Sequence, residues 1–154
     1  MSVAFRRDGD EEHLEPKFEI PIPPGPNRVT ARGLAQIAER IAGLETQLAG
    51  TSDDTAATAL KRDLRYWQTR QITAELVPPA SGETAEFGTT VTFRLNGKQR
   101  VLAIVGDDEA DPAGGSIAWT APLARALIGA EVGDLLDFGG KDEAIEVLAI
   151  TAIS

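Results

Sequence analysis

The sequence predicts an α+β protein, with an N-terminal antiparallel α-helical coiled-coil hairpin followed by an antiparallel-sheet domain that carries one short helix. Three observations predict this class. Apolar side chains recur at helical spacing in residues 34–48, they alternate as in strands in residues 89–105, and prolines punctuate the chain before and after the helical part. The length of 154 residues, 42% of them hydrophobic and 5% aromatic, suits one domain with an attachment and a mainly aliphatic core.

The composition of residues 1–27 predicts a disordered tail that is acidic and Pro-rich. Its acidic side chains cluster at Asp8, Asp10, Glu11, Glu12 and Glu15, and four prolines follow within residues 21–26. Such a segment buries too little apolar surface to offset the entropy lost on ordering it. We interpret the tail as a solvated linker, and a recognition peptide is the alternative.

Residues 28–78 predict a short antiparallel coiled-coil hairpin. Thr30 is the expected N-cap of the first helix and Gly50 its stop. Apolar residues three and four apart form the expected seam of this helix: Leu34, Ile37, Ile41, Leu44 and Leu48. Two amphipathic helices joined by four to five polar residues must pack antiparallel, because each covers the apolar stripe of the other.

The second helix is expected from about Thr55 to Leu76, where Pro78-Pro79 ends it. Its seam repeats the same spacing at Ala57, Leu60, Leu64, Trp67, Gln71 and Ala74. The most basic and aromatic part of this helix comprises Arg62, Arg65, Tyr66, Trp67 and Arg70. Stacking of this face on nucleic acid is one hypothesis. We expect instead that Trp67 lies in the seam and that the arginines are solvated.

Residues 79–154 predict the sheet domain. The expected strands are Thr89–Leu95, Gln99–Val105, Ser116–Thr120, Leu135–Phe138 and Ala144–Ile150. Asn96-Gly97 is typical of a type I′ turn between the first two strands. Pro122–Ile128 is the expected short helix, with Pro122 suited to its first position. Strands that dominate around one helix predict an antiparallel sheet.

Composition and charge exclude several classes of function. The chain has no Cys and a single His, His13, which lies in the tail, so thiol catalysis and most His-based triads are excluded. No apolar run reaches the roughly 18 residues of a membrane span, and we expect a cytoplasmic protein that has no membrane contact. Residues 79–154 carry five basic and twelve acidic side chains, which disfavours contact with a phosphate backbone and favours a protein partner with a basic patch. Solubility alone is the alternative explanation of this acidity.

Residues 105–138, VGDDEADPAGGSIAWTAPLARALIGAEVGDLLDF, resemble the C-terminal domain of bacterial Gre transcript-cleavage factors. The matching motifs are Gly106–Asp111, Ala121–Gly129 and Val132-Gly133-Asp134, and Phe87–Val91 resembles the opening strand of the family. A helical hairpin directly before this domain matches the domain order of the family.

The resemblance implies an FKBP-like fold for residues 79–154 and docking on bacterial RNA polymerase at the rim of the secondary channel. It implies that the hairpin enters this channel, and that acidic residues at its tip help to hold Mg²⁺ and a water at the polymerase active site, which cleaves backtracked RNA. The resemblance therefore implies contact with nucleic acid only through the polymerase complex, and no cofactor of the chain's own. We expect a monomer.

Two departures from the family decide our expectation about catalysis. The tip motif GDL-x-ENAEY is missing, so Asp53 and Asp54 are the only tip carboxylates, and Asp also caps helices. The hairpin is also shorter than that of the family, and each turn removed retracts its tip by about 5.4 Å. We therefore predict an elongation regulator that is not an enzyme and has no catalytic residue or metal site. The alternative is a cleavage factor that places Asp53 and Asp54 at the polymerase Mg²⁺.

The resemblance favours a polymerase-docking surface made of Asp107, Asp108, Glu109, Asp111, Pro122 and Arg125. A solvated acidic turn is the alternative for its carboxylates, and the run lacks the spacing of a Ca²⁺-binding loop. A prolyl isomerase or another protein-interaction module is a further alternative for an FKBP-like fold. An isomerase needs an aromatic-lined pocket, for which the domain offers Phe87, Phe93, Trp119 and Phe138.

Overall fold

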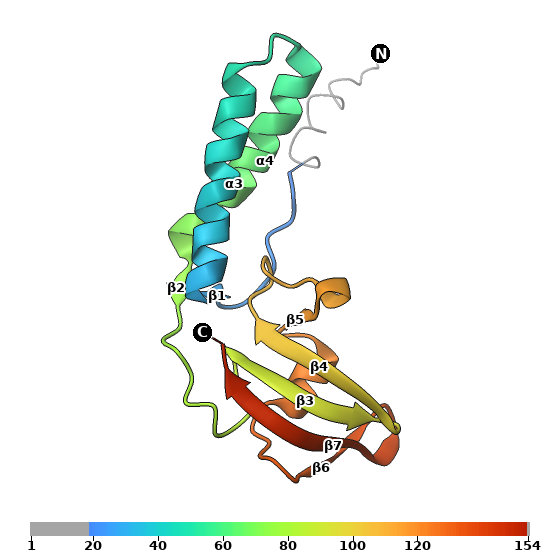
Figure 1. Cartoon of the computed structure of the whole chain (residues 1–154). Coiled ribbons are helices and arrows are strands. Elements are labelled where there is room, and N and C mark those ends of the chain that lie inside the picture. The colour runs from blue at the N-terminus through green and yellow to red at the C-terminus, as the bar shows by residue number, and fades with distance from the viewer. Residues whose placement is uncertain (1–18, 154) are drawn as a thin grey trace, which may run out of the picture. The chain divides into compact units, whose positions relative to one another are not determined.

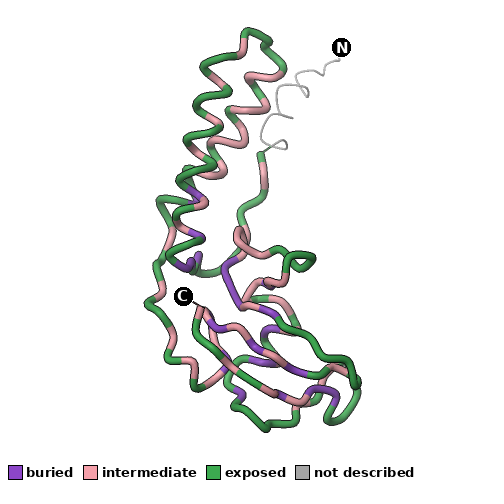
Figure 2. Tube along the Cα trace, in the orientation of Figure 1, coloured by how far each residue is buried: buried purple, intermediate pink, exposed green. Residues whose placement is uncertain are grey.

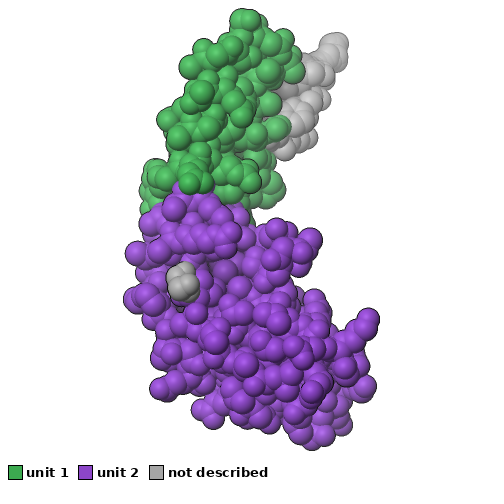
Figure 3. Space-filling model, in the orientation of Figure 1, with its two compact units in different colours: residues 1–24, 38–72 green, residues 25–37, 73–154 purple. Residues whose placement is uncertain are grey.

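The computed structural model describes residues 19–153 and shows an α+β protein (Figure 1). The acidic cluster and His13 of the predicted tail lie outside the described residues. Contacts divide the described residues into two compact units, residues 19–24 with 38–72 and residues 25–37 with 73–153 (Figure 3). Among residues 19–153, no helix combines the length and the apolar character that a membrane span requires.

Helix α3, Ala31–Ala49, begins and ends where the sequence predicts. Thr30 caps it, because the Gly33 amide donates to Thr30 Oγ1 at 3.0 Å. The helix ends directly before Gly50. The predicted seam residues are buried or half-buried while most neighbours are exposed (Figure 2), and Ile37 is the most buried of them, at 1% exposure. The apolar stripe of α3 therefore follows the predicted spacing.

Helix α4, Asp54–Thr73, lies beside α3 (Figure 1), and residues 50–53 join the two. Its N-cap is Asp53, whose Oδ2 accepts a hydrogen bond from the Ala56 amide at 2.8 Å. The prediction that α4 continues to Leu76 is wrong.

Short strands replace the predicted last turn of α4. Strand β2, Glu75–Leu76, pairs in parallel with β1, Arg28–Val29. The Glu75 amide donates to the Asn27 carbonyl at 2.8 Å, and the Val77 amide donates to the Val29 carbonyl at 3.0 Å. These bonds take backbone groups that a continuing helix would use, so the β1–β2 pair ends α4 three residues early.

The sheet has five strands in the order β5-β4-β3-β7-β6 (Figure 1). Their bounds are β3 Thr89–Leu95, β4 Lys98–Val105, β5 Ser116–Ala118, β6 Leu135–Phe138 and β7 Lys141–Ala152. The β3–β4 turn is of the predicted I′ type, since Asn96 and Gly97 both have positive φ, 53° and 86°. The prediction of a wholly antiparallel sheet is wrong, because β5 pairs in parallel with β4. The sheet is mixed.

The core of the sheet domain is aliphatic around one fully buried phenylalanine, Phe93. Helix α5, Pro122–Leu127, contributes Ala124 and Leu127, both 0% exposed, to this core. A 3-10 turn, η2, spans Pro112–Gly114 between β4 and β5. Because one face of α5 is buried in the core, the opposite face is exposed to solvent. This exposed face carries Pro122 and Arg125.

Candidate functional site

The two groups of predicted docking residues lie at one edge of the sheet. Because β4 and β5 are parallel, residues 106–111, which we call the acidic loop, and residues 119–121 leave the sheet at the same end. The Thr120 hydroxyl donates to Asp107 Oδ1 at 2.9 Å, and the Trp119 amide donates to the Val105 carbonyl at 2.9 Å. These bonds join the acidic loop to the segment that starts α5, and so bring both groups together.

The acidic loop starts at a close approach between two backbones. Gly106 is buried, and a Cβ built there would fall well inside 3.0 Å of the Arg28 carbonyl oxygen. Only glycine fits this position, although its φ is not positive. The Glu109 and Ala110 amides then both donate to the Gly106 carbonyl, at 3.2 and 3.1 Å. The loop is therefore a tight turn held against strand β1.

The carboxylates of the acidic loop have different neighbours. Glu109 Oε1 accepts a hydrogen bond from the Thr30 hydroxyl at 2.6 Å. The Asp111 carboxylate folds over η2, since a Cβ on Gly114 would lie 2.5 Å from Asp111 Oδ2. Asp107, Asp108 and Glu109 are half-buried, and Asp111 is exposed. Within residues 19–153, no group of three His, Cys, Asp or Glu side chains has the geometry of a metal site.

A groove beside α5 was not predicted from the sequence. It encloses about 530 Å³ and is lined by Arg28, Val77, Glu86, Phe87, Trp119, Thr120, Arg125 and Ile128. The Arg28 guanidinium lies 4.6 Å from the centre of the Trp119 ring, a cation–π contact. Phe87 meets Trp119 edge to face at 6.5 Å, and the buried Trp119 Nε1 has no hydrogen-bond partner among the described residues. The sequence signal for this groove was the pair Phe87 and Trp119, two of the aromatic residues named for an isomerase pocket.

The aromatic residues proposed for an isomerase pocket do not form one cluster at this groove. Phe87 and Trp119 line it, whereas Phe93 is fully buried in the core. Phe138 is half-buried against that same core.

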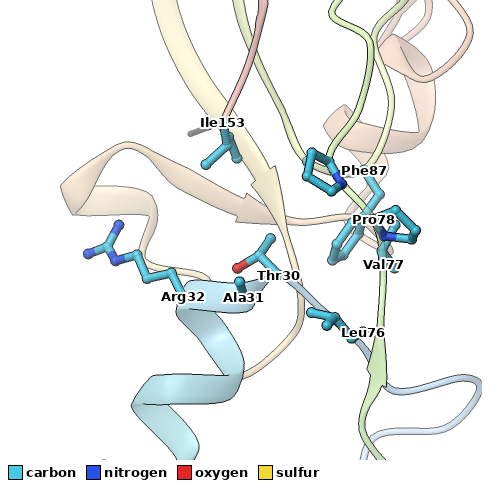
Figure 4. A pocket seen from close by; sticks show the side chains of 10 residues that line it. Thr30, Ala31, Arg32, Leu76, Val77, Pro78, Phe87 and Ile153 are labelled. Carbon is cyan, nitrogen blue, oxygen red and sulfur yellow. The ribbon is translucent and has the colours of Figure 1, made fainter.

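A smaller apolar pocket of about 150 Å³ lies beside the start of α3 (Figure 4). The first turn of α3 lines it with Thr30, Ala31 and Arg32, and the segment after β2 and the end of the chain provide most of its apolar side chains. Its volume suits a single side chain. The first turn of α3 therefore lines one side of this pocket, within the same compact unit as the sheet.

The basic and aromatic face of α4 is only partly as predicted. Trp67 is half-buried, and the Arg40 guanidinium lies 5.1 Å from its ring centre. Arg65 binds Glu19 with two hydrogen bonds, Nε to Oε1 at 2.9 Å and Nη2 to Oε2 at 2.5 Å. The bond to Arg65 lowers the pKa of Glu19 from its ordinary value. The expectation that all these arginines are solvated is wrong for Arg70, which is only 2% exposed.

The predicted tip residues lie where the connection from α3 enters α4: Asp53 ends the connection and Asp54 is the first residue of α4. Asp53 and Asp54 are both exposed, and Asp53 uses one carboxylate oxygen to cap α4. The capping interpretation of Asp53 is therefore confirmed.

Comparison with known proteins identifies the sheet domain. The family model "Transcription elongation factor, GreA/GreB, C-term" matches residues 80–154. These residues form a Gre C-terminal domain. Transcription elongation factor GreA of Chelativorans sp. (strain BNC1) is 41% identical over 78 residues, 48% of this chain and 50% of that protein. Transcription elongation factor GreB of Neisseria meningitidis serogroup A is 37% identical over 100 residues, 61% of either chain. The resemblance to the Gre family is confirmed.

The Gre match leaves much of the relatives' length uncovered, since the chain spans only 50% and 61% of the two proteins. The match to a solved structure, prokaryotic transcription elongation factor GreA/GreB from Nitrosomonas europaea, covers 83% of this chain and 99% of that chain. The sequence identity is 21% and the TM-score is 0.40, so the likeness is distant. The prediction that the protein is not an enzyme is contradicted, because the matched relatives are GreA and GreB factors, the class that the resemblance associates with transcript cleavage.

Proposed function

We propose that the protein binds bacterial RNA polymerase at the rim of the secondary channel and regulates transcription elongation there. The observation that carries this proposal is a GreA/GreB C-terminal domain whose acidic loop is hydrogen-bonded to the segment that starts α5. In this proposal α3 and α4 form an antiparallel coiled coil that enters the channel, and the mixed sheet with α5 has an FKBP-like arrangement.

The docking surface comprises Asp107, Asp108, Glu109, Asp111, Pro122 and Arg125. Its carboxylates stand on a domain with five basic and twelve acidic side chains, whose negative potential steers a basic partner surface toward it. Pro122 and Arg125 are exposed beside the loop, on the face of α5 that points away from the core. The charges accelerate and orient the encounter, and the neighbouring groove offers the apolar area that a stable complex needs.

A second candidate function is stimulation of transcript cleavage through Asp53 and Asp54. The match to GreA and GreB favours it. Both aspartates are exposed, and carboxylate oxygens are ligands that Mg²⁺ accepts. Capping of α4 occupies only one oxygen of Asp53, so its other oxygen stays available for a metal ion held by the polymerase.

A binding experiment tests the docking surface. The full chain is compared with a variant that carries Asp107→Asn, Asp108→Asn, Glu109→Gln and Asp111→Asn, by pull-down and by titration of purified RNA polymerase. We expect at least a tenfold loss of affinity, and a wild-type affinity that falls as salt rises.

The matched control neutralises four exposed carboxylates of the same unit, Glu83, Glu131, Asp142 and Glu143, and so makes the same change in net charge. It should bind like the wild type. Equal losses of affinity in both variants would mean that the acidic loop acts only through the net charge of the domain. Unchanged binding in both variants would mean that the loop is not part of the interface.

A stalled elongation complex separates the two candidate functions. RNA shortening that needs the protein, and that is lost in the variant Asp53→Asn with Asp54→Asn, assigns cleavage to these carboxylates. The substitution Asp53→Asn keeps a good N-cap, so loss of the helix does not explain such a result. An altered elongation rate without shortened RNA assigns regulation alone.

A further inference from the structure

We infer that Glu109, unlike the other carboxylates of the proposed docking surface, is a positioning residue. It fixes the first turn of α3 to the acidic loop and acts on polymerase binding through that turn rather than by direct contact. This inference rests on the proposed function for its effect on polymerase, and on the geometry around Thr30 for its physical basis.

Three groups form a continuous chain of hydrogen bonds at the start of α3. The Gly33 amide donates to Thr30 Oγ1 at 3.0 Å, and Thr30 Oγ1 donates to Glu109 Oε1 at 2.6 Å. A hydroxyl has one proton and two acceptor sites, so Thr30 fills both roles at once. The second distance lies in the range of charge-assisted O–H···O⁻ bonds, which are about twice as strong as neutral ones.

The first turn of α3 lacks an acidic residue of its own. It begins with Ala31, Arg32 and Gly33, and Arg32 places a positive charge at the positive end of the helix dipole. A carboxylate is stabilising at that end, and Glu109 supplies it from a segment 79 residues away from Thr30 in sequence. The acidic loop therefore completes a helix start that the local sequence leaves incomplete.

Gly33 is the position that lets the carboxylate approach. A Cβ on Gly33 would lie 2.7 Å from Glu109 Oε1 and 3.4 Å from Thr30 Oγ1. Glycine in a helix is otherwise unfavourable compared with alanine, and this contact is the structural reason for its presence here.

The backbone of the acidic loop is fixed to the same stretch of chain. Gly106 packs against the Arg28 carbonyl, two residues before Thr30, and its own carbonyl accepts from the Glu109 amide. Both ends of Glu109 are thus held relative to residues 28–33. A displacement of the loop by a docked partner must move the first turn of α3, and a displacement of that turn must move the loop.

Two full-length variants test this inference. Thr30→Val removes the hydroxyl and keeps every charge of the acidic loop. Glu109→Asp also keeps the charge, and shortens the side chain by one methylene so that it no longer reaches Thr30. We expect both to speed hydrogen exchange of the amides of residues 33–37, by up to about fivefold. Thr30→Val removes the cap itself, and Glu109→Asp removes the hydrogen bond to Thr30 and withdraws the carboxylate from the positive end of the helix. Both should weaken polymerase binding by a similar factor.

Coupling is read from the double variant, Thr30→Val with Glu109→Asp, which should bind polymerase no more weakly than either single variant. Thr30→Ser restores the hydroxyl and should behave as the wild type, and Asp142→Asn serves as a control for exchange. Gly33→Ala raises intrinsic helix propensity, yet it should weaken polymerase binding because its Cβ displaces the carboxylate.

Additive losses of affinity in the double variant would mean that Glu109 contacts the polymerase directly, and would overturn the inference. So would faster exchange with unchanged affinity, or wild-type behaviour of Glu109→Asp in both measurements. If the wild type itself does not bind polymerase, the proposed function fails. The exchange data then still decide the structural part, since unchanged exchange in Thr30→Val and Glu109→Asp would refute the positioning role.

Discussion

Replacement of Gly106 by alanine tests the close approach that fixes the acidic loop. The added Cβ would fall inside 3.0 Å of the Arg28 carbonyl oxygen, and would also meet Arg28 C at 3.5 Å and Val29 Cα at 3.7 Å. All three atoms belong to backbone, and β1 cannot retreat without breaking its pairing with β2. Overpacking against atoms that cannot move costs about 3 kcal/mol, the upper end of the usual range.

Thermal unfolding followed by circular dichroism measures this cost. For a chain of this length, about 3 kcal/mol lowers the melting temperature by about 6–12 °C. Gly43→Ala is the matched control, because a Cβ there meets nothing within 4 Å and alanine stabilises a helix by up to about 1 kcal/mol. The same chemical change should therefore have opposite signs at the two positions. A Gly106→Ala variant that melts at or above the wild-type temperature would refute the steric argument.

Three further predictions follow from single contacts. Asp53→Ala removes the cap on the Ala56 amide and should cost about 1 kcal/mol of stability in chemical denaturation, with Asp53→Ser close to the wild type. Phe93→Ala empties a fully buried site and should cost about 3–5 kcal/mol in the same assay; a loss under about 1 kcal/mol would contradict the assigned core. The hydrogen bond from Arg65 lowers the pKa of Glu19 below its ordinary 4.5, so this pair stabilises the fold above that pH and its contribution is lost as the pH falls through the lowered pKa. An NMR titration should show the pKa of Glu19 rising in Arg65→Gln, and an unchanged value would argue against the pair.

Local patterns predicted the elements whose structure is set locally. Strands β3 and β6 have the predicted bounds, and Thr30 caps α3 as expected. In each case the determining information lies within a few residues: alternation of side chains, a turn with two positive φ angles, or a cap three residues before its donor.

Features that depend on pairing between distant segments were not predicted. Alternation shows which face of a strand is buried and does not show which strand lies beside it, so the parallel neighbour of β4 could not be read from β5. Strands β1 and β2 have two residues each, too few for any period, and exist because of one another. The same pairing ended α4 at Thr73, whereas Pro78-Pro79 marked only the last possible position.

The candidate site was predicted as a set of residues and not as an arrangement. The resemblance grouped the carboxylates of the acidic loop with Pro122 and Arg125, and the parallel β4–β5 pairing supplied the reason why they are neighbours. No sequence pattern connects Glu109 with Thr30. Gly33 was the one local sign of that contact, since a helix uses glycine in its first turn at a cost unless something approaches closely.

The β1–β2 pair has a consequence for how such proteins can diversify. Strand β1 precedes the helical hairpin and β2 follows it, so their pairing holds the two ends of residues 30–74 next to each other. Segments whose two ends are adjacent can be lengthened, shortened or exchanged with little disturbance of the part that receives them. A relative could therefore carry helices of another length between these two strands, while the strand pair and the sheet domain keep their structure.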